Sequence, residues 1–406
     1  MGRVSEGDPA SGDLASEDLA SGDAARGPRL RPDLAPLRAS GGFRLVFASR
    51  TVTALGTQAS EVALLVQAKQ LTGSPLAVGL LGVVELVPLV VFGLYGGVLA
   101  DRFDRRALMR WGEVSAVMMA AASLQRPSFD ASLPRLVRRD QLTAASALLS
   151  TSQNASFLIG SALGGVLAVT PGPWLVYGVD GAGFAVSFGL LTRLRPLPGS
   201  SGDDHATWRG ITAGLRYAVR RQDLLGSYLA DLTAMIFAYP NALFPFLAAQ
   251  LHAPWATGLM FAAPSVGAFG VTVFSGWMGR VRRHGVAIAL SAGAWGVMMA
   301  GFGLSPDLYV ALACLIAAGA ADMVSGIFRS TLWNQTIPDA LRGRLAGVEL
   351  LSYGVGPSAG QLRSGVVASL VSTRFSLVSG GLFCVGGVAV VCALLPGFVR
   401  YKSEPA

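Results

Sequence analysis

The feature of this chain that most constrains its fold is a series of apolar stretches, each about as long as a membrane-spanning helix. A helix needs about 20 largely apolar residues to cross a bilayer. Backbone polar groups in lipid must be satisfied within each helix, so this pattern predicts an all-α membrane protein with about 11 hydrophobic segments. Ten stretches are clear and an eleventh, 107–124, is ambiguous; the ten lie at 43–67, 76–99, 145–169, 173–193, 226–249, 256–279, 286–304, 308–328, 346–370 and 375–397.

The charged residues are few and are placed unevenly. Charged residues make up 14% of the chain, the mean hydropathy is +0.52 and the net charge is +8; soluble domains carry about 25% charged residues. The arginines fall in alternate connections between the apolar stretches, and we count Arg329 among them. Cytoplasmic loops carry the excess of Lys and Arg, so we expect both termini in the cytoplasm and a multi-pass protein of the bacterial inner (plasma) membrane. Scattered charge of this kind also argues against nucleic-acid binding.

The chain divides into four parts by composition. Residues 1–40 form a polar tail with too few apolar residues to fold, and we expect this tail to be disordered. A first helical half follows at 41–194 and a second at 226–406. Between them, 195–225 is rich in Pro, Gly and Arg, and we expect a cytoplasmic connecting loop with a surface helix.

A motif at the end of the second stretch identifies a family resemblance. Gly97-Val-Leu-Ala-Asp101-Arg102-Phe-Asp104-Arg105-Arg106 resembles the loop signature of the major facilitator superfamily, with Asp104 where a second glycine is usual. The resemblance implies two helical half-bundles that alternately open a central site to each side of the membrane. It also implies a conformational latch formed by Gly97, Asp101, Arg102, Arg105 and Arg106. A carboxylate such as Asp101 can meet an arginine or a helix N-terminus of the other half.

A second resemblance is narrower. The segment from Arg126 to Leu142 is similar to the basic loop before the fifth span of enterobactin-type siderophore exporters and related drug–proton antiporters. The next stretch carries Gly160, Gly164 and Gly165, an arrangement that resembles the antiporter signature with Ser161 in place of proline. Small residues let membrane helices approach closely, so simple packing and an antiporter role both remain open. The resemblance implies export of a drug- or siderophore-like small molecule in exchange for protons, and we expect a monomer.

The first half is shorter than the second. The segment from Arg106 to Arg126 is less than half as long as the corresponding one from Arg283 to Arg329. About one helix is therefore missing from the N-terminal half. If 107–124 crossed the membrane, every later basic connection would lie outside the cell. Either 107–124 does not cross, or the chain is a shortened and inactive variant.

Charged residues within the apolar stretches are the candidates for substrate or proton binding, because charge is costly in lipid. Arg50 and Glu61 lie about 20° apart around a helix, with Thr57 on the same face. Glu61 and Asp231 are the first choices, since the first and seventh helices line the cavity in the family. A kink is expected after Asp231, at Tyr239-Pro240. The full candidate set is Arg50, Glu61, Asp180, Asp231 and Asp322.

Other classes of function find little support in the sequence. There is no phosphate-binding G-x-x-x-x-G-K-[ST] loop, and Gly356-Pro-Ser358-Ala-Gly360 falls within an apolar stretch instead of a strand–turn–helix. We therefore expect no enzyme, cofactor or metal. The expected partners are a small-molecule substrate, protons and the lipid bilayer. Two alternatives to export remain: uptake or lipid-linked transport on the same fold, and a remnant that transports nothing because a helix is missing.

Overall fold

The computed structural model describes residues 34–84, 86, 136–138, 141–169, 172–194, 216–337 and 339–402. Within these ranges the chain is helical, with short turns and 3-10 segments between the helices. The latch motif at 97–106, the ambiguous segment 107–124 and most of the polar tail lie outside them. The longer helices are α3 (Gly41–Thr72), α7 (Leu142–Val169), α8 (Pro173–Thr192), α10 (Gln222–Ala238), α12 (Thr257–Val273), α13 (His284–Leu304), α14 (Leu308–Thr336), α15 (Asp339–Leu370) and α16 (Thr373–Leu394). Shorter ones are α2 (Ala35–Ala39), 75–84, α11 (Phe244–Gln250) and α17 (Pro396–Arg400).

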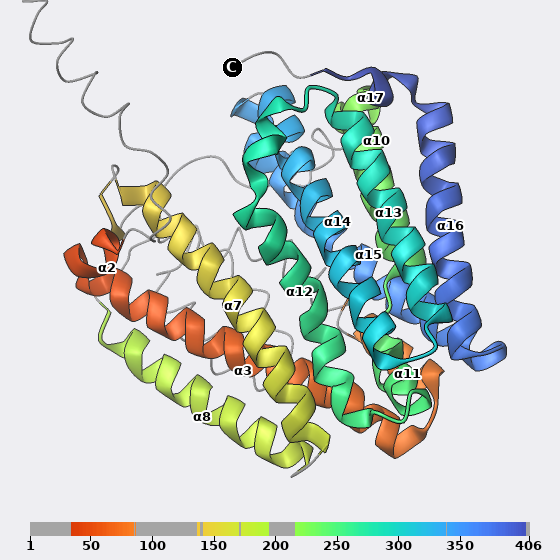
Figure 1. Ribbon diagram of the computed structural model, residues 1–406. Coiled ribbons are helices and arrows are strands. Elements are labelled where there is room, and N and C mark those ends of the chain that lie inside the picture. The colour runs from red at the N-terminus through yellow and green to blue at the C-terminus, as the bar shows by residue number, and fades with distance from the viewer. Residues whose placement is uncertain are drawn as a thin grey trace, which may run out of the picture.

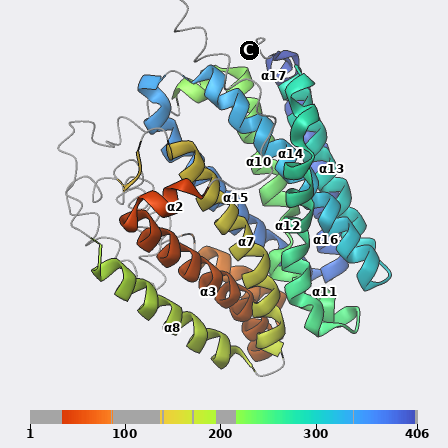
Figure 2. The ribbon, with the colours of Figure 1, turned by 60° about the vertical axis from the view of Figure 1, so that its left-hand side comes forward.

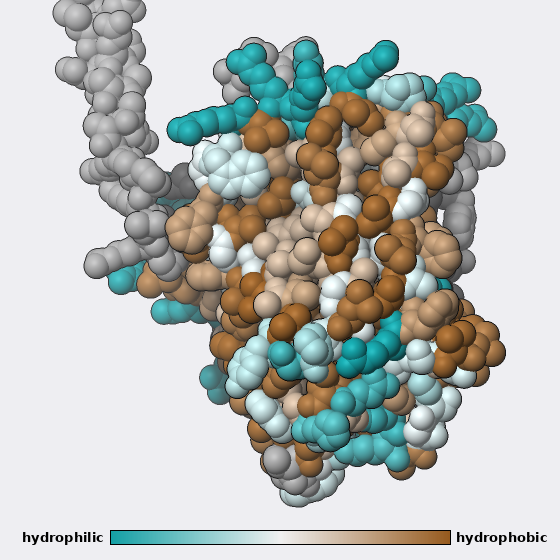
Figure 3. Space-filling view, turned by 45° about the vertical axis from the view of Figure 1, so that its right-hand side comes forward, coloured by the Kyte–Doolittle hydropathy of each residue, from teal (hydrophilic) through white to brown (hydrophobic). Residues whose placement is uncertain are grey.

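Seven segments of the described chain are long and apolar enough to cross a membrane. They are α7, α8, the pair α10 and α11 taken together, α12, α13, α14 and α16. Helices α3 and α15 are 32 residues long, more than the bilayer requires, but they are more polar than the seven. Figure 3 shows apolar side chains over much of the middle of one face, with hydrophilic side chains at the upper end and again toward the lower end. The prediction of an all-helical membrane protein is confirmed by this architecture.

The helices pack in two groups (Figure 1). In the N-terminal group, α3 packs against α7 and α8; in the C-terminal group, α13 packs against α14 and α16, and α10 against α13, α15 and α16. Figures 1 and 2 agree that α7 of the first group lies beside α12 of the second, and that the two diverge toward the end where α17 lies. The domain boundaries expected from the sequence stay a prediction.

Polar side chains join the helices of the N-terminal group. Hydroxyl–hydroxyl hydrogen bonds link Ser49 of α3 to Ser187 of α8 and Thr51 of α3 to Ser152 of α7, each at 2.6 Å. Between membrane helices such bonds contribute about 0.6–2 kcal/mol each. These contacts fix the register of α3, which carries two of the candidate site residues.

Candidate functional site

The C-terminal group holds a buried ion pair between Asp231 of α10 and Arg329 of α14. Both side chains are 4% exposed. The attraction between two deeply buried charges offsets the large cost of removing them from water. Loss of either partner would leave the other charge buried and unpaired. The sequence placed Arg329 in a basic connection, and that prediction is wrong. Helix α14 continues to Thr336, so Arg329 lies within the helix and faces α10.

A second contact fixes the register of these two helices. One turn beyond the ion pair, the indole Nε1 of Trp333 donates to the hydroxyl of Ser227 at 2.9 Å. The residues Ser227 and Asp231 on α10 thus oppose Trp333 and Arg329 on α14, in the register of antiparallel neighbours. The ring of Tyr228 stacks on Trp333, with centroids 4.9 Å apart. The charged groups are therefore held on a packed scaffold.

Asp322 is the third charged member of this group. It lies two helical turns before Arg329 on α14 and interacts electrostatically with both Arg329 and Asp231. We refer to Asp231, Asp322 and Arg329 as the charged triad. It holds two carboxylates and one guanidinium, so with all three ionised it carries one net negative charge. An extra proton or a cationic group would neutralise it.

The triad lies next to a break in the seventh membrane segment. Helix α10 ends at Ala238, a 3-10 turn follows at Asn241–Leu243, and α11 resumes at Phe244. The break falls at Tyr239-Pro240, as the sequence predicted, because proline has no N–H to donate. By the register of α10 and α14, Asp322 lies level with Ala238. Irregular backbone at membrane depth is tolerated only where protein or a cavity covers it.

Arg363 of α15 satisfies the backbone at this break. Its guanidinium donates to the carbonyl oxygens of Phe237 at 2.8 Å and Ser376 at 2.9 Å, and to the Ser379 hydroxyl at 3.0 Å. The Phe237 carbonyl would bond the N–H of Asn241 in a continuous helix, so Arg363 replaces the bond that the break removes. Arg363 thus ties α10, α15 and α16 together.

The candidate site residues of the N-terminal group take part in two separate contacts of α3. Asp180 of α8 accepts a hydrogen bond from the Ser60 hydroxyl of α3 at 2.6 Å and lies against Gly56, where an added Cβ would meet the Asp180 carboxylate. Asp180 therefore holds α8 against α3. Glu61 points from another face of α3, with the Gln58 amide donating to it at 2.9 Å. Arg50 and Glu61 are half-buried and Thr57 is exposed. The sequence predicted that these three residues share one face of α3.

The glycines of the antiporter-like signature lie where helices touch. A Cβ added to Gly160 or Gly164 would meet the backbone of Leu55 or Ala59 of α3 at 2.6 Å or less. A Cβ on Gly165 would meet the Cα of Gly258 of α12 at 2.1 Å, so Gly165 packs against the other helix group. Gly160 and Gly164 thus pack α7 against α3 within the N-terminal group, and Gly165 alone lies at the seam between the two groups.

The same end of the bundle holds two further contacts between the groups. The Lys69 ammonium of α3 donates to the Pro245 carbonyl of α11 at 2.7 Å and lies 5.5 Å from the Phe246 ring centroid. Gly79, in helix 75–84, approaches the backbone of α15, where its added Cβ would meet the Cα of Gly365 at 3.0 Å. The two groups are therefore joined at the end where α3 and α7 finish.

A group of polar contacts around Arg221 lies at the opposite end of the helix bundle, just before α10 begins. Arg221 binds both carboxylate oxygens of Asp223, at 3.1 and 2.5 Å, and also donates to the Tyr217 hydroxyl at 3.2 Å. The hydrogen bonds with Asp223 raise the pKa of Arg221 above its usual value. Arg221 further reaches the Thr336 carbonyl at 3.4 Å, where a cation is favourable at the C-terminus of α14. The connection between the halves is thereby tied to the C-terminal group.

The structure brings together only part of the predicted site. Asp231 pairs with Arg329, and Asp322 lies two turns before Arg329 on the same helix, whereas Asp180 and Glu61 belong to separate contacts of α3. The signal for Arg329 was its position seven residues after Asp322, which puts both on one face if α14 is long enough. In the part of the chain that the structure describes, no three His, Cys, Asp or Glu side chains come close enough to hold a metal ion.

Comparison with known sequences gives matches along nearly the whole chain. The sequence model of the major facilitator family described as transmembrane secretion effector matches residues 32–124 and 114–405. The chain is 28% identical to the enterobactin exporter EntS of Citrobacter koseri in an alignment of 403 residues that covers 92% of this chain and 96% of the relative. It is 26% identical to the enterobactin exporter EntS of Shigella flexneri, with the same coverage.

Solved transporter structures share the fold. A bacterial homologue of the iron transporter ferroportin, in an inward-facing state, matches with a TM-score of 0.65 and 15% identity, covering 90% of this chain and 99% of that one. The nucleoside transporter NupG matches with a TM-score of 0.69 and 13% identity, covering 89% and 100%. At these identities the likeness concerns the fold alone: an all-helical arrangement shared with major facilitator transporters.

Proposed function

Because the chain belongs to the transmembrane secretion effector family of major facilitator transporters and is not an enzyme, we propose that it exports a small molecule across the inner membrane. The observation that carries this proposal is the similarity to enterobactin exporters over 92% of this chain and 96% of the relative. The substrate class that this similarity favours is a siderophore- or drug-like molecule. The two helix groups would open alternately to each side, around a site near the middle of the bilayer.

We further propose that protons drive the export through the charged triad. The triad has one carboxylate more than its single arginine can pair, and Asp231 is the one bound to Arg329. Asp322 is then the group that can gain and lose a proton while the Asp231–Arg329 pair stays intact. In this proposal Glu61 and Arg50 take part from α3 of the N-terminal group, while Asp180 contributes through the α3–α8 contact. The latch at Gly97, Asp101, Arg102, Arg105 and Arg106 would restrain one of the two conformations.

The test is transport into everted inner-membrane vesicles with an acidic interior, using enterobactin and ethidium as probes. Export in the cell predicts accumulation of at least one probe, loss of accumulation with a protonophore, and loss in Asp322→Asn. The matched control Arg280→Met removes an exposed charge from the segment after α12 and should transport normally. Accumulation in right-side-out vesicles instead would support uptake and contradict the proposal.

The remnant alternative rests on a length mismatch. The alignment with the Citrobacter relative is longer than the part of this chain that it covers, so the relative has positions with no counterpart here. The family match also comes in two pieces, 32–124 and 114–405, which overlap at 114–124, within the ambiguous segment 107–124. A chain that inserts stably yet moves neither probe would favour a remnant.

Topology decides whether the shortened half keeps its orientation. Single cysteines at Ser132, Ser200 and Ser403, in a background without Cys314, Cys384 and Cys392, are labelled in intact cells with an impermeant thiol reagent. We expect protection at all three sites, with both termini and the central connection in the cytoplasm. Labelling of Ser132 and Ser200 from outside would mean that the second part of the bundle is inverted.

A further inference from the structure

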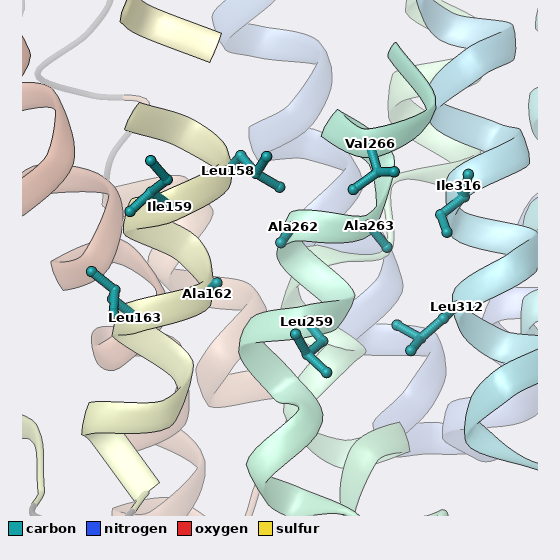
Figure 4. Close-up of a pocket in the computed structure, with 10 residues that line it drawn as sticks. All are labelled: Leu158, Ile159, Ala162, Leu163, Leu259, Ala262, Ala263, Val266, Leu312 and Ile316. Carbon is teal, nitrogen blue, oxygen red and sulfur yellow. The ribbon is translucent and has the colours of Figure 1, made fainter. Parts of the chain in front are cut away.

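An apolar groove lies on the seam between the two helix groups (Figure 4). Its volume is about 400 Å³, and all ten of its lining side chains are apolar. Helix α7 forms one wall and helices α12 and α14 form the other. The lining residues are Leu158, Ile159, Ala162, Leu163, Leu259, Ala262, Ala263, Val266, Leu312 and Ile316.

The groove opens at the surface of the described helices. Its rim residues Ile159, Leu163 and Val266 are 49%, 51% and 46% exposed, whereas Ala262 and Ala263 on its floor are 5% exposed. The exposed apolar surface continues without a polar residue from the rim into the groove. The hollow exists because small alanines stand where the neighbouring positions carry leucine, isoleucine or valine.

Aromatic side chains indicate how deep the groove lies in the membrane. Trp255 precedes α12 and Tyr309 begins α14, and they are 51% and 83% exposed. Exposed Trp and Tyr at helix ends are typical of the headgroup level. Leu312 and Ile316 follow Tyr309 by three and seven residues, about 5 and 10 Å along the helix. Val266 of α12 follows Trp255 by eleven residues, about 16 Å, so the groove extends from near the headgroup level to about the middle of the bilayer, about 15 Å from either edge of the hydrocarbon layer.

We propose that this groove binds one acyl chain of a bilayer phospholipid, from the leaflet on the side of Trp255 and Tyr309. A wholly apolar lining offers no hydrogen bond to a headgroup, an ion or a polar solute, so it selects hydrocarbon. The volume lies in the range of about 300–1,000 Å³ that small-molecule sites occupy. Its exposed apolar rim belongs to helices long and apolar enough to cross a membrane, so the hydrocarbon of that leaflet is the occupant we assign to it.

The bound chain would touch both helix groups at once. The groove adjoins the contact between Gly165 and Gly258, where α7 and α12 meet backbone to backbone. Any motion that separates α7 from α12 widens the groove and removes contacts from the acyl chain. The lipid thus stabilises the arrangement in which this end of the seam is joined. The inference depends on the membrane fold and not on the proposed export.

The test is photolabelling in proteoliposomes of a phospholipid with a diazirine midway along one acyl chain, mapped by mass spectrometry. We expect adducts on the groove residues at about tenfold higher density than on Leu382 and Leu394, which are exposed on α16; tenfold corresponds to about 1.4 kcal/mol of preferential binding. Ala262→Phe and Val266→Trp fill the groove from the floor and the rim, and each should lower the labelling to the α16 level.

The control Leu382→Trp adds the same bulk to a lipid-facing residue outside the groove and should leave groove labelling unchanged. Equal adduct density on the groove and on α16 would overturn the proposal, as would labelling that survives both filling variants. Disulfide cross-linking between protomers through cysteines at Ile159 or Val266 would assign the groove to a second copy and also overturn it. Photolabelling needs no transport, so a chain without flux can still give either result.

Discussion

Replacing Arg329 by methionine removes the one positive charge of the triad and keeps most of the apolar stem. Removing one partner of a buried ion pair costs about 3–5 kcal/mol, because the other charge is left unpaired. Here both Asp231 and Asp322 are left without the positive charge of Arg329. Asp231→Asn has a smaller cost, about 1–3 kcal/mol, since Arg329 keeps Asp322 as a second carboxylate. The structure thus predicts an asymmetry between the two halves of one ion pair.

The double variant Asp231→Asn/Arg329→Met sharpens this test, because it leaves one unpaired carboxylate instead of two. It should be more stable than Arg329→Met alone. The measurement is the free energy of unfolding in mixed micelles, titrated with a denaturing detergent. The control Arg280→Met replaces an exposed arginine and changes the net charge by the same amount as Arg329→Met. Its free energy of unfolding should stay within about 0.5 kcal/mol of the parent. If Asp231→Asn proves as costly as Arg329→Met, Asp322 does not share the arginine and the triad is only a pair.

Three other substitutions test the seam and the helix break. Gly258→Val places a side chain where Gly165 touches α12, and this overpacking should destabilise the contact by about 1–3 kcal/mol. The joined end of the seam should then open more often, and thiol labelling of a cysteine placed beside it should rise about 10- to 100-fold. Lys69→Met removes a charged hydrogen bond worth about 1.5–3 kcal/mol between the two groups and should raise the same labelling. Arg363→Met leaves the Phe237 carbonyl without its donor and should lower the melting temperature of the detergent-solubilised protein, with Arg363→Lys restoring part of the loss; equal melting temperatures for the two variants would argue against the carbonyl contacts.

The parts of the fold that the sequence predicted well are those set by composition and by proline chemistry. About 20 apolar residues in a row specify a membrane helix whatever its neighbours are. The break at Tyr239-Pro240 follows from one missing N–H, which no neighbouring helix can supply. The family resemblance carried by the motif from Gly97 to Arg106 is confirmed by the match to the secretion effector family, whereas an antiporter role of Gly160, Gly164 and Gly165 stays a prediction.

The pairing of charges could not be predicted in the same way. Arg329 looked like a loop residue because its neighbours after Phe328 are polar, and only the contact with Asp231 reveals a helix that continues past the apolar stretch. The sequence ranked Glu61 above Asp180 by its helix alone, because periodicity gives the face of a helix but not the partner on that face. Which carboxylate meets Ser60 and which meets Gln58 depends on how α8 lies against α3. Residue spacing within one helix carries no information on how a neighbouring helix packs against it.

The two kinds of contact in this molecule suit two different tasks. Within the C-terminal group, α10 is held by a buried ion pair and by the three hydrogen bonds of Arg363, all of which are costly to break. Between the groups, at the joined end, the contacts described are glycine against backbone at Gly165 and Gly79 and one lysine hydrogen bond. Dispersion contacts between small residues are lost gradually and re-formed without stranding a charge. A transporter that rocks one group against the other needs this difference, because the moving seam must open at little cost while each group stays intact.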